Sequence, residues 1–402
     1  MSTKFILCIF ILGLISIINS ADIDTSKTYQ TIKGFGGMNH PDWIADLTTD
    51  QVNKAFKNGD GELGFSILRM PVSENTGSWA KCVNSAKTAQ SLGALVFASP
   101  WNPPASMSEQ FNEGGRSGKR LRHDKYGDYA QHLNSFVKYM KENGVELYAI
   151  SIQNEPDYAH DWTWWTSSEC ADFAANYADQ IDCKIMSCET FQYNKQYYND
   201  ILSNSKANGN IDLFGTHFYG TQRNQMDFPA LENDPRDIWM TEVYVPNSSS
   251  DADTWPEAVE VAVNIHNGLV IGGMNAYVWW YIRRSYGPMK DNGNISKRGY
   301  MMAHFSKYVR PGAVRLDCTE SPANDVYLSA YKNTDGTIAV VAINNSNQNS
   351  DQTFNIKGAT ITSVTRYQTS QGENLAKSSV NAANGSFSAT INSRSVSTFV
   401  IS

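Results

Sequence analysis

The stretch SIQNEPDYAHDWTWWT, residues 151–166, places a carboxylate at the end of an apolar run and follows it with aromatic rings. The run 147–150 predicts a buried strand, which ends at Asn154-Glu155-Pro156. Tyr158 and Trp162 follow within ten residues. In parallel α/β folds, functional side chains lie just after the carboxyl ends of strands. The stretch therefore indicates a parallel sheet whose strand ends build a site.

Seven other apolar runs have the same character, and helical patterns separate several of them. The predicted strands span residues 32–38, 65–71, 94–99, 146–153, 184–188, 213–219, 238–243 and 276–281, and predicted helices include 48–57, 79–92, 125–143, 167–180 and 255–268. The strands are nearly continuous apolar runs, which is typical of a parallel sheet covered on both faces. Eight such units over about 270 residues predict an α/β fold, the (β/α)8 TIM barrel.

The chain changes character after residue 308. Short strands are predicted at 326–331, 338–344, 352–356, 361–367 and 395–400, with a hairpin turn at NTDGT, residues 333–337. All ten Trp lie between Trp43 and Trp280, so the last part of the chain has none. We expect a barrel over residues 33–308 and an antiparallel β-sandwich side domain built from both chain ends, residues 21–32 and 309–402.

The N-terminus predicts a secretory signal peptide over residues 1–20, with Lys4, an apolar run 5–18 and small residues at the cleavage point. No later run is long and apolar enough to cross a membrane. We therefore expect a secreted, extracellular and monomeric protein without a membrane partner. The net charge of −7 makes nucleic acid a poor partner. Five Cys remain after the signal, and an odd number leaves at least one thiol without an intrachain partner.

Polar and aromatic residues gather at the ends of six predicted strands: 68–71, 99–102, 153–155, 216–219, 240–244 and 279–284. Two carboxylates among them, Glu155 and Glu242, end the fourth and seventh strands. Glycoside hydrolysis requires such a pair, one group as a proton donor and one as an anion. An Arg such as Arg69 would keep one carboxylate ionised, while an apolar wall would raise the pKa of the other. The alternatives are that each Glu caps a helix or pairs with a Lys, and that Arg69 only forms an ion pair inside the barrel.

Other motifs point away from different chemistry. The GxGxxG match at residues 59–64 precedes a strand, so we interpret it as a turn. HExxH, P-loop and paired CxxC motifs are absent from the sequence. No metal or cofactor is expected. His217 is equally compatible with a site role and a structural role.

Seven motifs, in chain order, resemble glycoside hydrolase family 30 in its glucuronoxylanase branch. They are GFGGMNHPDWI, GFSILRM, FASPWNPP, ISIQNEPDYAHDWTWWT, GTHFYG, WMTEVY and YVWWYIRRSYGPM. The resemblance covers nearly all of the chain after the signal and implies a retaining endo-β-1,4-xylanase. By motif, Glu155 would be the acid/base and Glu242 the nucleophile, with carboxyl groups about 5–5.5 Å apart. Asn154 would contact the 2-hydroxyl of the cleaved sugar, and Tyr219 and Arg69 would hold the nucleophile.

The branch also implies a substrate. Its members cut xylan near a (methyl)glucuronic acid side group, which an Arg-x-Tyr motif after the eighth strand binds. Arg284-Ser285-Tyr286 matches this motif, and its spacing favours Arg284 over Arg283. Arg forms bidentate, charge-assisted hydrogen bonds with carboxylates. The substrate-binding residues expected beside the two catalytic Glu are Asn154, Arg69, Trp101, Tyr158, Trp162, Tyr219, Tyr244, Ser248, Trp279, Arg284 and Tyr286.

The expected partner is thus the polysaccharide glucuronoxylan. Two alternatives stay open. A relaxed family member, such as a plain xylanase or another β-glycosidase, would keep both Glu without depending on Arg284. A non-catalytic carbohydrate-binding protein would lack one of them, and both are present.

Overall fold

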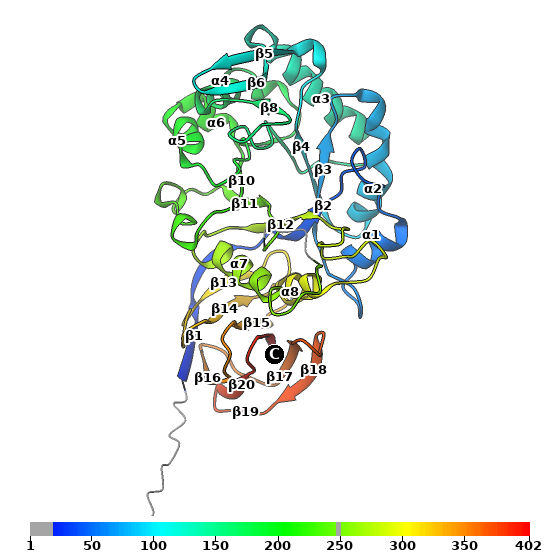
Figure 1. Cartoon of the computed structure of the whole chain (residues 1–402). Helices are drawn as coiled ribbons and strands as arrows, with labels where there is room; N and C mark the ends of the chain where they lie inside the picture. The colour runs from blue at the N-terminus through cyan, green and yellow to red at the C-terminus, as the bar shows by residue number, and fades with distance from the viewer. Residues whose placement is uncertain (1–18, 247–250) are drawn as a thin grey trace, which may run out of the picture.

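A closed barrel of eight parallel strands forms the upper part of the molecule in Figure 1; the computed structural model describes residues 19–246 and 251–402. The barrel strands are β2 (Gly34–Met38), β3 (Ile67–Val72), β4 (Leu95–Pro100), β7 (Ala149–Ser151), β9 (Lys184–Met186), β10 (Leu213–His217), β11 (Asp237–Glu242) and β12 (Ala276–Tyr281). Strand β12 pairs with β2, and β9 pairs with β10, so the ring has no free edge. The predicted TIM barrel is confirmed, and every predicted strand overlaps an observed one.

Apolar side chains fill the inside of the barrel. The inward layer consists of Ile67, Phe97, Ala149, Met186, Leu213, Trp239, Ala276 and Val278. Trp239 is fully buried there and stacks on Tyr148 at 5.3 Å between ring centroids. Strands β2 and β3 approach so closely that a Cβ on Gly36 would lie 1.7 Å from the Ile67 carbonyl oxygen. Only glycine fits at that position.

Helices cover the outside of the barrel. They are α1 (Thr49–Phe56), α2 (Val83–Ser91), α3 (Tyr126–Glu142), α4 (Ser167–Asn176), α5 (Lys195–Ser203), α6 (Ser205–Asn210), α7 (Val259–Val270) and α8 (Lys297–Ser306). Two predicted helices start too early. Residues 79–82 of the predicted helix 79–92 belong to a 3-10 helix, Thr76–Cys82, and α7 begins at Val259 rather than at residue 255. Residues 218–236, between β10 and β11, contain only short 3-10 turns.

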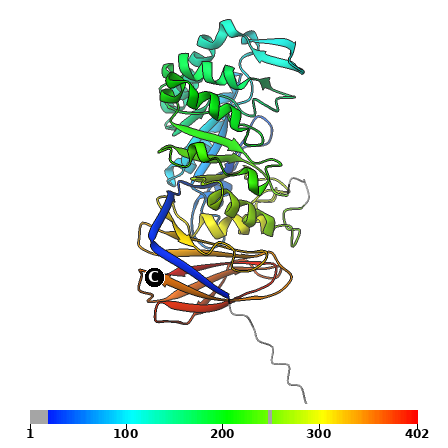
Figure 2. The same cartoon turned by 90° about the vertical axis from the view of Figure 1, so that its left-hand side faces the viewer.

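A small sheet, absent from the prediction, stands on the mouth side of the barrel. A hairpin of β5 (Ser108–Glu113) and β6 (Arg116–Leu121) follows β4, and β8 (Thr163–Trp164) pairs in parallel with β6. The hairpin strands read SEQFNE and RSGKRL. Such polar sequences lack the apolar alternation by which strands are detected. Figure 2 shows the hairpin projecting from the top of the barrel.

The lower part of the molecule is the predicted β-sandwich side domain, built from both chain ends (Figure 1). Its strands are β1 (Asn19–Thr31), β13 (Val314–Cys318), β14 (Val326–Lys332), β15 (Ile338–Asn344), β16 (Ser350–Lys357), β17 (Val364–Thr369), β18 (Ala376–Val380), β19 (Ala382–Ala383), β20 (Ser386–Ile391) and β21 (Ser395–Ile401). Phe354, Phe387 and Phe399 stack at its centre. One pairing departs from the antiparallel pattern, because β1 is antiparallel to β13 but parallel to β16.

Two predictions concern segments that the structure does not describe. Residues 1–18 of the predicted signal peptide lie outside the described residues, and so does Ser248. Within residues 19–246 and 251–402, no helix has both the length and the apolar character needed to cross a bilayer.

Candidate active site

Two glutamates from opposite sides of the barrel meet at its mouth. Glu155 follows β7, and Glu242 is the last residue of β11. Both are almost fully buried. One carboxylate oxygen of each, together with a ring nitrogen of His217, lies within 4.8 Å of the other two. A carboxyl pair this close can serve glycoside hydrolysis, in which one group donates a proton and the other acts as an anion.

Two neighbours hold the carboxylate of Glu242. The guanidinium of Arg69, which is fully buried, donates from Nη1 to Glu242 Oε2. The hydroxyl of Tyr219 donates to the other oxygen, Oε1, at 2.7 Å. Arg69 also donates to Asn154 Oδ1 at 2.7 Å and to Ser99 Oγ at 3.0 Å, so its orientation is fixed. A buried carboxylate paired in this way favours the charged form that a nucleophile requires.

Glu155 has the opposite environment. Burial raises its pKa to about 7, and the nearby charge of Glu242 acts in the same direction, although His217 and Arg69 partly oppose the shift. Its backbone has a φ of 41°, in the left-handed region that a Glu seldom adopts, and Pro156 follows. The Glu155 N–H donates to the Glu189 carbonyl at 2.8 Å, which holds this sharp turn in place. The two carboxyl groups of the site thus lie in contrasting environments.

A third buried carboxylate, Glu189, follows β9 and was not predicted. One of its oxygens lies 3.1 Å from Arg69 Nη2 and 3.5 Å from His217 Nε2. His217 Nδ1 contacts Glu155 Oε1 at 2.8 Å. Burial alone would lower the pKa of His217, but the surrounding carboxylates outweigh it and raise the pKa to about 9. His217 thus lies among the carboxylates of the site, in contact with Glu155 and Glu189.

The same geometry argues against a resident metal here. Glu155, His217 and Glu242 could in principle supply donor atoms. The Arg69 guanidinium, paired with Glu242 and Glu189, already places positive charge against these carboxylates. That charge would repel a divalent cation.

Aromatic rings line a cleft of about 290 Å³ over the two glutamates. Its lining consists of Trp43, Trp101, Asn154, Glu155, Tyr158, Trp162, Phe191, Tyr219, Glu242, Tyr244 and Trp280. Eight of these were predicted site residues. Trp43, Phe191 and Trp280 were not, although Trp43 and Phe191 follow the first and fifth barrel strands and Trp280 lies near the end of the eighth. Such rings provide flat apolar faces beside the polar groups that cleave a bond.

Trp279 is a correction, since the structure places it away from this cleft. Its side chain is fully buried in the core between the barrel and its helices. Ala276 and Val278 point into the barrel, so alternation along β12 turns Trp279 outward and brings Trp280 to the mouth.

The residues expected to bind the side group lie beside the cleft. Tyr244 lines it, and the Tyr244 and Tyr286 ring centroids are 5.0 Å apart. The Arg284 guanidinium carbon lies 5.3 Å from the Tyr281 ring centroid. Arg283 is engaged elsewhere, because it donates to Gln51 Oε1 at 3.0 Å and to the Ala45 carbonyl at 2.7 Å. Of the two arginines, Arg284 is thus the better placed to reach a ligand.

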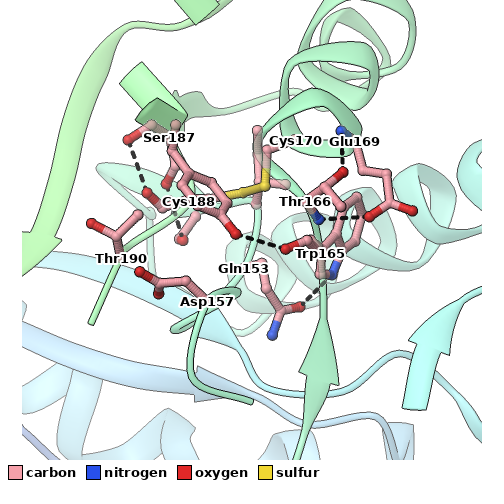
Figure 3. The surroundings of a disulfide bond; sticks show 12 residues. Gln153, Asp157, Trp165, Thr166, Glu169, Cys170, Ser187, Cys188 and Thr190 are labelled. Carbon is pink, nitrogen blue, oxygen red and sulfur yellow. Dashed lines mark hydrogen bonds between the residues drawn. A yellow bond between two sulfur atoms is a disulfide. The ribbon is translucent and has the colours of Figure 1, made fainter. Parts of the chain in front are cut away.

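A disulfide supports the fifth strand end. Cys170 on α4 is bonded to Cys188, the residue before Glu189, as Figure 3 shows. Nearby, Trp165 donates to Gln153 Oε1 at 3.1 Å, which ties the aromatic segment to the strand that carries Glu155. Cys82, Cys183 and Cys318 are free thiols, so the odd cysteine count is accommodated with one bridge among the described residues.

A (β/α)8 barrel with this carboxylate pair at its mouth defines a glycoside hydrolase. Residues 312–399 match the family model described as "Glycosyl hydrolase family 30 beta sandwich domain". The glucuronoxylanase XynC of Bacillus subtilis (strain 168) is 51% identical over 396 residues, covering 97% of this chain and 94% of that protein.

Solved structures agree. A GH30 endoxylanase from Clostridium papyrosolvens C71 has a TM-score of 0.89 at 41% identity, covering 95% of this chain and 99% of that one. The glycoside hydrolase family 30 subfamily 8 xylanase Xyn30A from Clostridium acetobutylicum has a TM-score of 0.87 at 34% identity, covering 95% and 99%. This chain belongs to glycoside hydrolase family 30.

Proposed function

We propose that this protein is a retaining endo-β-1,4-xylanase that cleaves glucuronoxylan beside its acidic side groups. The observation that carries the proposal is the pair Glu155 and Glu242, whose oxygens lie within 4.8 Å in contrasting environments. Burial favours a protonated Glu155, whereas Arg69 and Tyr219 hold Glu242 as an anion. The xylanase relatives support the choice of substrate.

In the first half of the reaction, Glu242 attacks the anomeric carbon. A bond forms between its carboxylate oxygen and that carbon while the glycosidic C–O bond breaks. The proton of Glu155 moves to the leaving oxygen, so Glu155 becomes a carboxylate. The Asn154 amide, oriented through its oxygen by Arg69, is expected to hydrogen-bond to the 2-hydroxyl of this sugar.

In the second half, a water enters where the leaving group departed. Glu155, now ionised, takes a proton from that water, and the resulting hydroxide attacks the anomeric carbon. The ester bond to Glu242 breaks, and its carboxylate returns to Arg69 and Tyr219. Two inversions at one carbon give net retention of configuration.

Substrate choice follows from the residues beside the cleft. The protein is acidic overall, with a net charge of −7, so an anionic polymer needs a local cation. Arg284, whose guanidinium lies over the Tyr281 ring, supplies one, and Arg binds carboxylates through two parallel hydrogen bonds. The predicted signal peptide supports secretion, which suits a polymer found outside the cell, and we propose that the enzyme acts as a monomer.

The function is tested on two polymers of matched length. We expect efficient hydrolysis of glucuronoxylan and little of arabinoxylan without glucuronate. Proton NMR during hydrolysis should show the β-anomer of the new reducing end appearing first. Equal rates on both polymers would reject the side-group dependence, and a first-formed α-anomer would reject the retaining mechanism.

Arg284→Ala isolates the side-group contact. We expect kcat/KM on glucuronoxylan to fall. The fall should correspond to a loss of about 2–4 kcal/mol of transition-state binding, because leaving a buried anion without its charged partner costs on that order. Arg283→Ala is the matched control, since it removes the same charge one residue away but contacts Gln51 and Ala45. An equal loss in both variants would show that the effect is not specific to Arg284.

A further inference from the structure

We propose that Glu189 is the shared counterion of Arg69 and His217, and that it thereby couples the protonation of Glu155 to the charge on Glu242. The inference rests on the proposed function for the roles of the two catalytic glutamates. Glu189 itself touches neither the cleft nor a substrate position, because it is fully buried and absent from the cleft lining. It is therefore a positioning residue.

The geometry places Glu189 between the two halves of the site. Its Oε2 lies 3.1 Å from Arg69 Nη2, and Arg69 binds the nucleophile through its other terminal nitrogen. The same oxygen lies 3.5 Å from His217 Nε2, and His217 contacts the acid/base through Nδ1. One carboxylate oxygen thus joins two cations, each of which contacts a different catalytic glutamate.

The backbone fixes this carboxylate as firmly as its charges do. The Glu189 N–H donates to the Gln153 carbonyl at 2.9 Å, and its own carbonyl accepts from the Glu155 N–H. The Cys170–Cys188 bridge anchors the preceding residue to α4. Gly215 on β10 leaves room for the side chain, because a Cβ there would lie 3.0 Å from Glu189 Cγ.

Charge balance explains why a third carboxylate is needed. With Arg69 and His217 cationic, Glu189 and Glu242 anionic and Glu155 protonated, these five groups are neutral together. When Glu155 gives up its proton, Glu242 loses its charge in the ester bond, so the sum stays at zero. Without Glu189 the cluster would carry an uncompensated buried positive charge throughout, which is unfavourable at low dielectric.

Other ionisable groups near Glu189 leave this balance intact. Ser99 on β4 contributes a neutral hydroxyl near its carboxylate. Asp157 accepts a hydrogen bond from the Phe191 N–H at 2.9 Å, and its charge acts on His217 rather than on Glu189. Tyr219 stays neutral, because burial holds its pKa well above the usual value. The charges that face Glu189 are therefore those of Arg69 and His217.

The decisive variant is Glu189→Gln, which removes the charge and keeps the shape. A cluster with one extra positive charge loses its first proton more easily. In the pH profile of kcat/KM on glucuronoxylan, the fall on the alkaline side should therefore occur at a pH lower by about one unit or more. Glu189→Asp keeps the charge, so the alkaline fall in its pH profile should stay near the wild-type pH even if kcat is lower. Glu146→Gln, an exposed charge removal at the opposite end of the barrel, should change neither.

A second readout needs no substrate. Nitrogen-15 NMR of the His217 ring should show an imidazolium at neutral pH in the wild-type protein and proton loss at lower pH in Glu189→Gln. A neutral His217 in the wild type would overturn the proposal, even if Glu189→Gln failed to fold. So would a folded Glu189→Gln with an unchanged alkaline fall and unchanged His217 titration. A protein inactive on every xylan but with these His217 shifts would refute the proposed function while leaving the counterion role intact.

Discussion

The role of acid that we propose for Glu155 requires its protonated form in the first chemical step. Burial raises its pKa to about 7. A general acid must carry its proton, so kcat/KM should fall as pH rises through about 7. An aryl xyloside with a good leaving group needs little protonation, so the same limb should be much weaker with that substrate. The test compares pH profiles for the two substrates.

Glu155→Gln extends that prediction. The variant should lose most activity on xylan, keep formation of the glycosyl-enzyme from the activated xyloside, and show no alkaline limb in that step. Full activity on xylan would remove Glu155 from the acid role. Glu242→Gln, which cannot form the ester, is the contrasting control and should be inactive on both substrates.

At the scale of single residues, the sequence predicted much of the site. The site residues that it missed were missed for one reason. The ends of six strands were considered, and they supplied Glu155, Glu242 and Arg69, which the structure brings together. Barrel closure makes all eight strand ends line one mouth. Glu189 follows the fifth strand, and Trp43 follows the first. Residues 184–189 read KIMSCE, where a single acid looks like an ordinary turn residue.

Strand β12 shows why the order of residues alone could not assign every aromatic side chain. Its sequence AYVWWY is apolar at every position, because both faces of a barrel strand are covered. Period-two alternation is then invisible in the sequence, and pairing with β2 is shifted after Trp279. Only the observed inward layer determines which Trp faces the mouth. The polar hairpin β5–β6 escaped prediction for the opposite reason, since it has few apolar residues to alternate.

The adjacent pair on β12 gives a matched experiment. Trp279→Ala should destabilise the fold by about 3–5 kcal/mol, because it opens a cavity in the core, with little effect on kcat/KM of the folded fraction. Trp280→Ala should leave the unfolding free energy nearly unchanged and lower kcat/KM about tenfold through loss of a sugar platform. Urea unfolding and xylan kinetics on both variants measure the two effects. The reverse pattern would mean that the side assignment of β12 is wrong.

On the scale of the molecule, the side domain is joined to the barrel through buried polar contacts. His304 on α8 contacts Thr398 Oγ1 on β21 at 2.8 Å through Nδ1, and Thr369 Oγ1 on β17 at 2.9 Å through Nε2. Lys297, at the start of the same helix, donates to the carbonyls of Ser370 and Glu373. The two parts therefore share groups that neither can satisfy alone, and we expect them to unfold in one transition.

His304 makes that union sensitive to pH. Burial lowers its pKa to about 3, whereas an unfolded chain has a His pKa near ~6.5. As pH falls below that unfolded value, the unfolded chain takes up a proton that the folded protein refuses, so stability is lost on acidification. Between pH 7 and pH 5 the protonation of this single group should lower the free energy of unfolding by about 2 kcal/mol.

His304→Gln tests this argument. The variant should be less stable than wild type at pH 7, because it disturbs the contacts with Thr398 and Thr369. It should lose less stability on acidification, because Gln cannot take up a proton. The control is His123→Gln, which removes an exposed His that pairs with Glu169 on the barrel and does not contact the side domain. Calorimetry measures the number of unfolding transitions, and urea unfolding at both pH values measures the free energy of unfolding. Two separate transitions, or equal acid losses in wild type and His304→Gln, would show that this contact does not unite the barrel and the side domain.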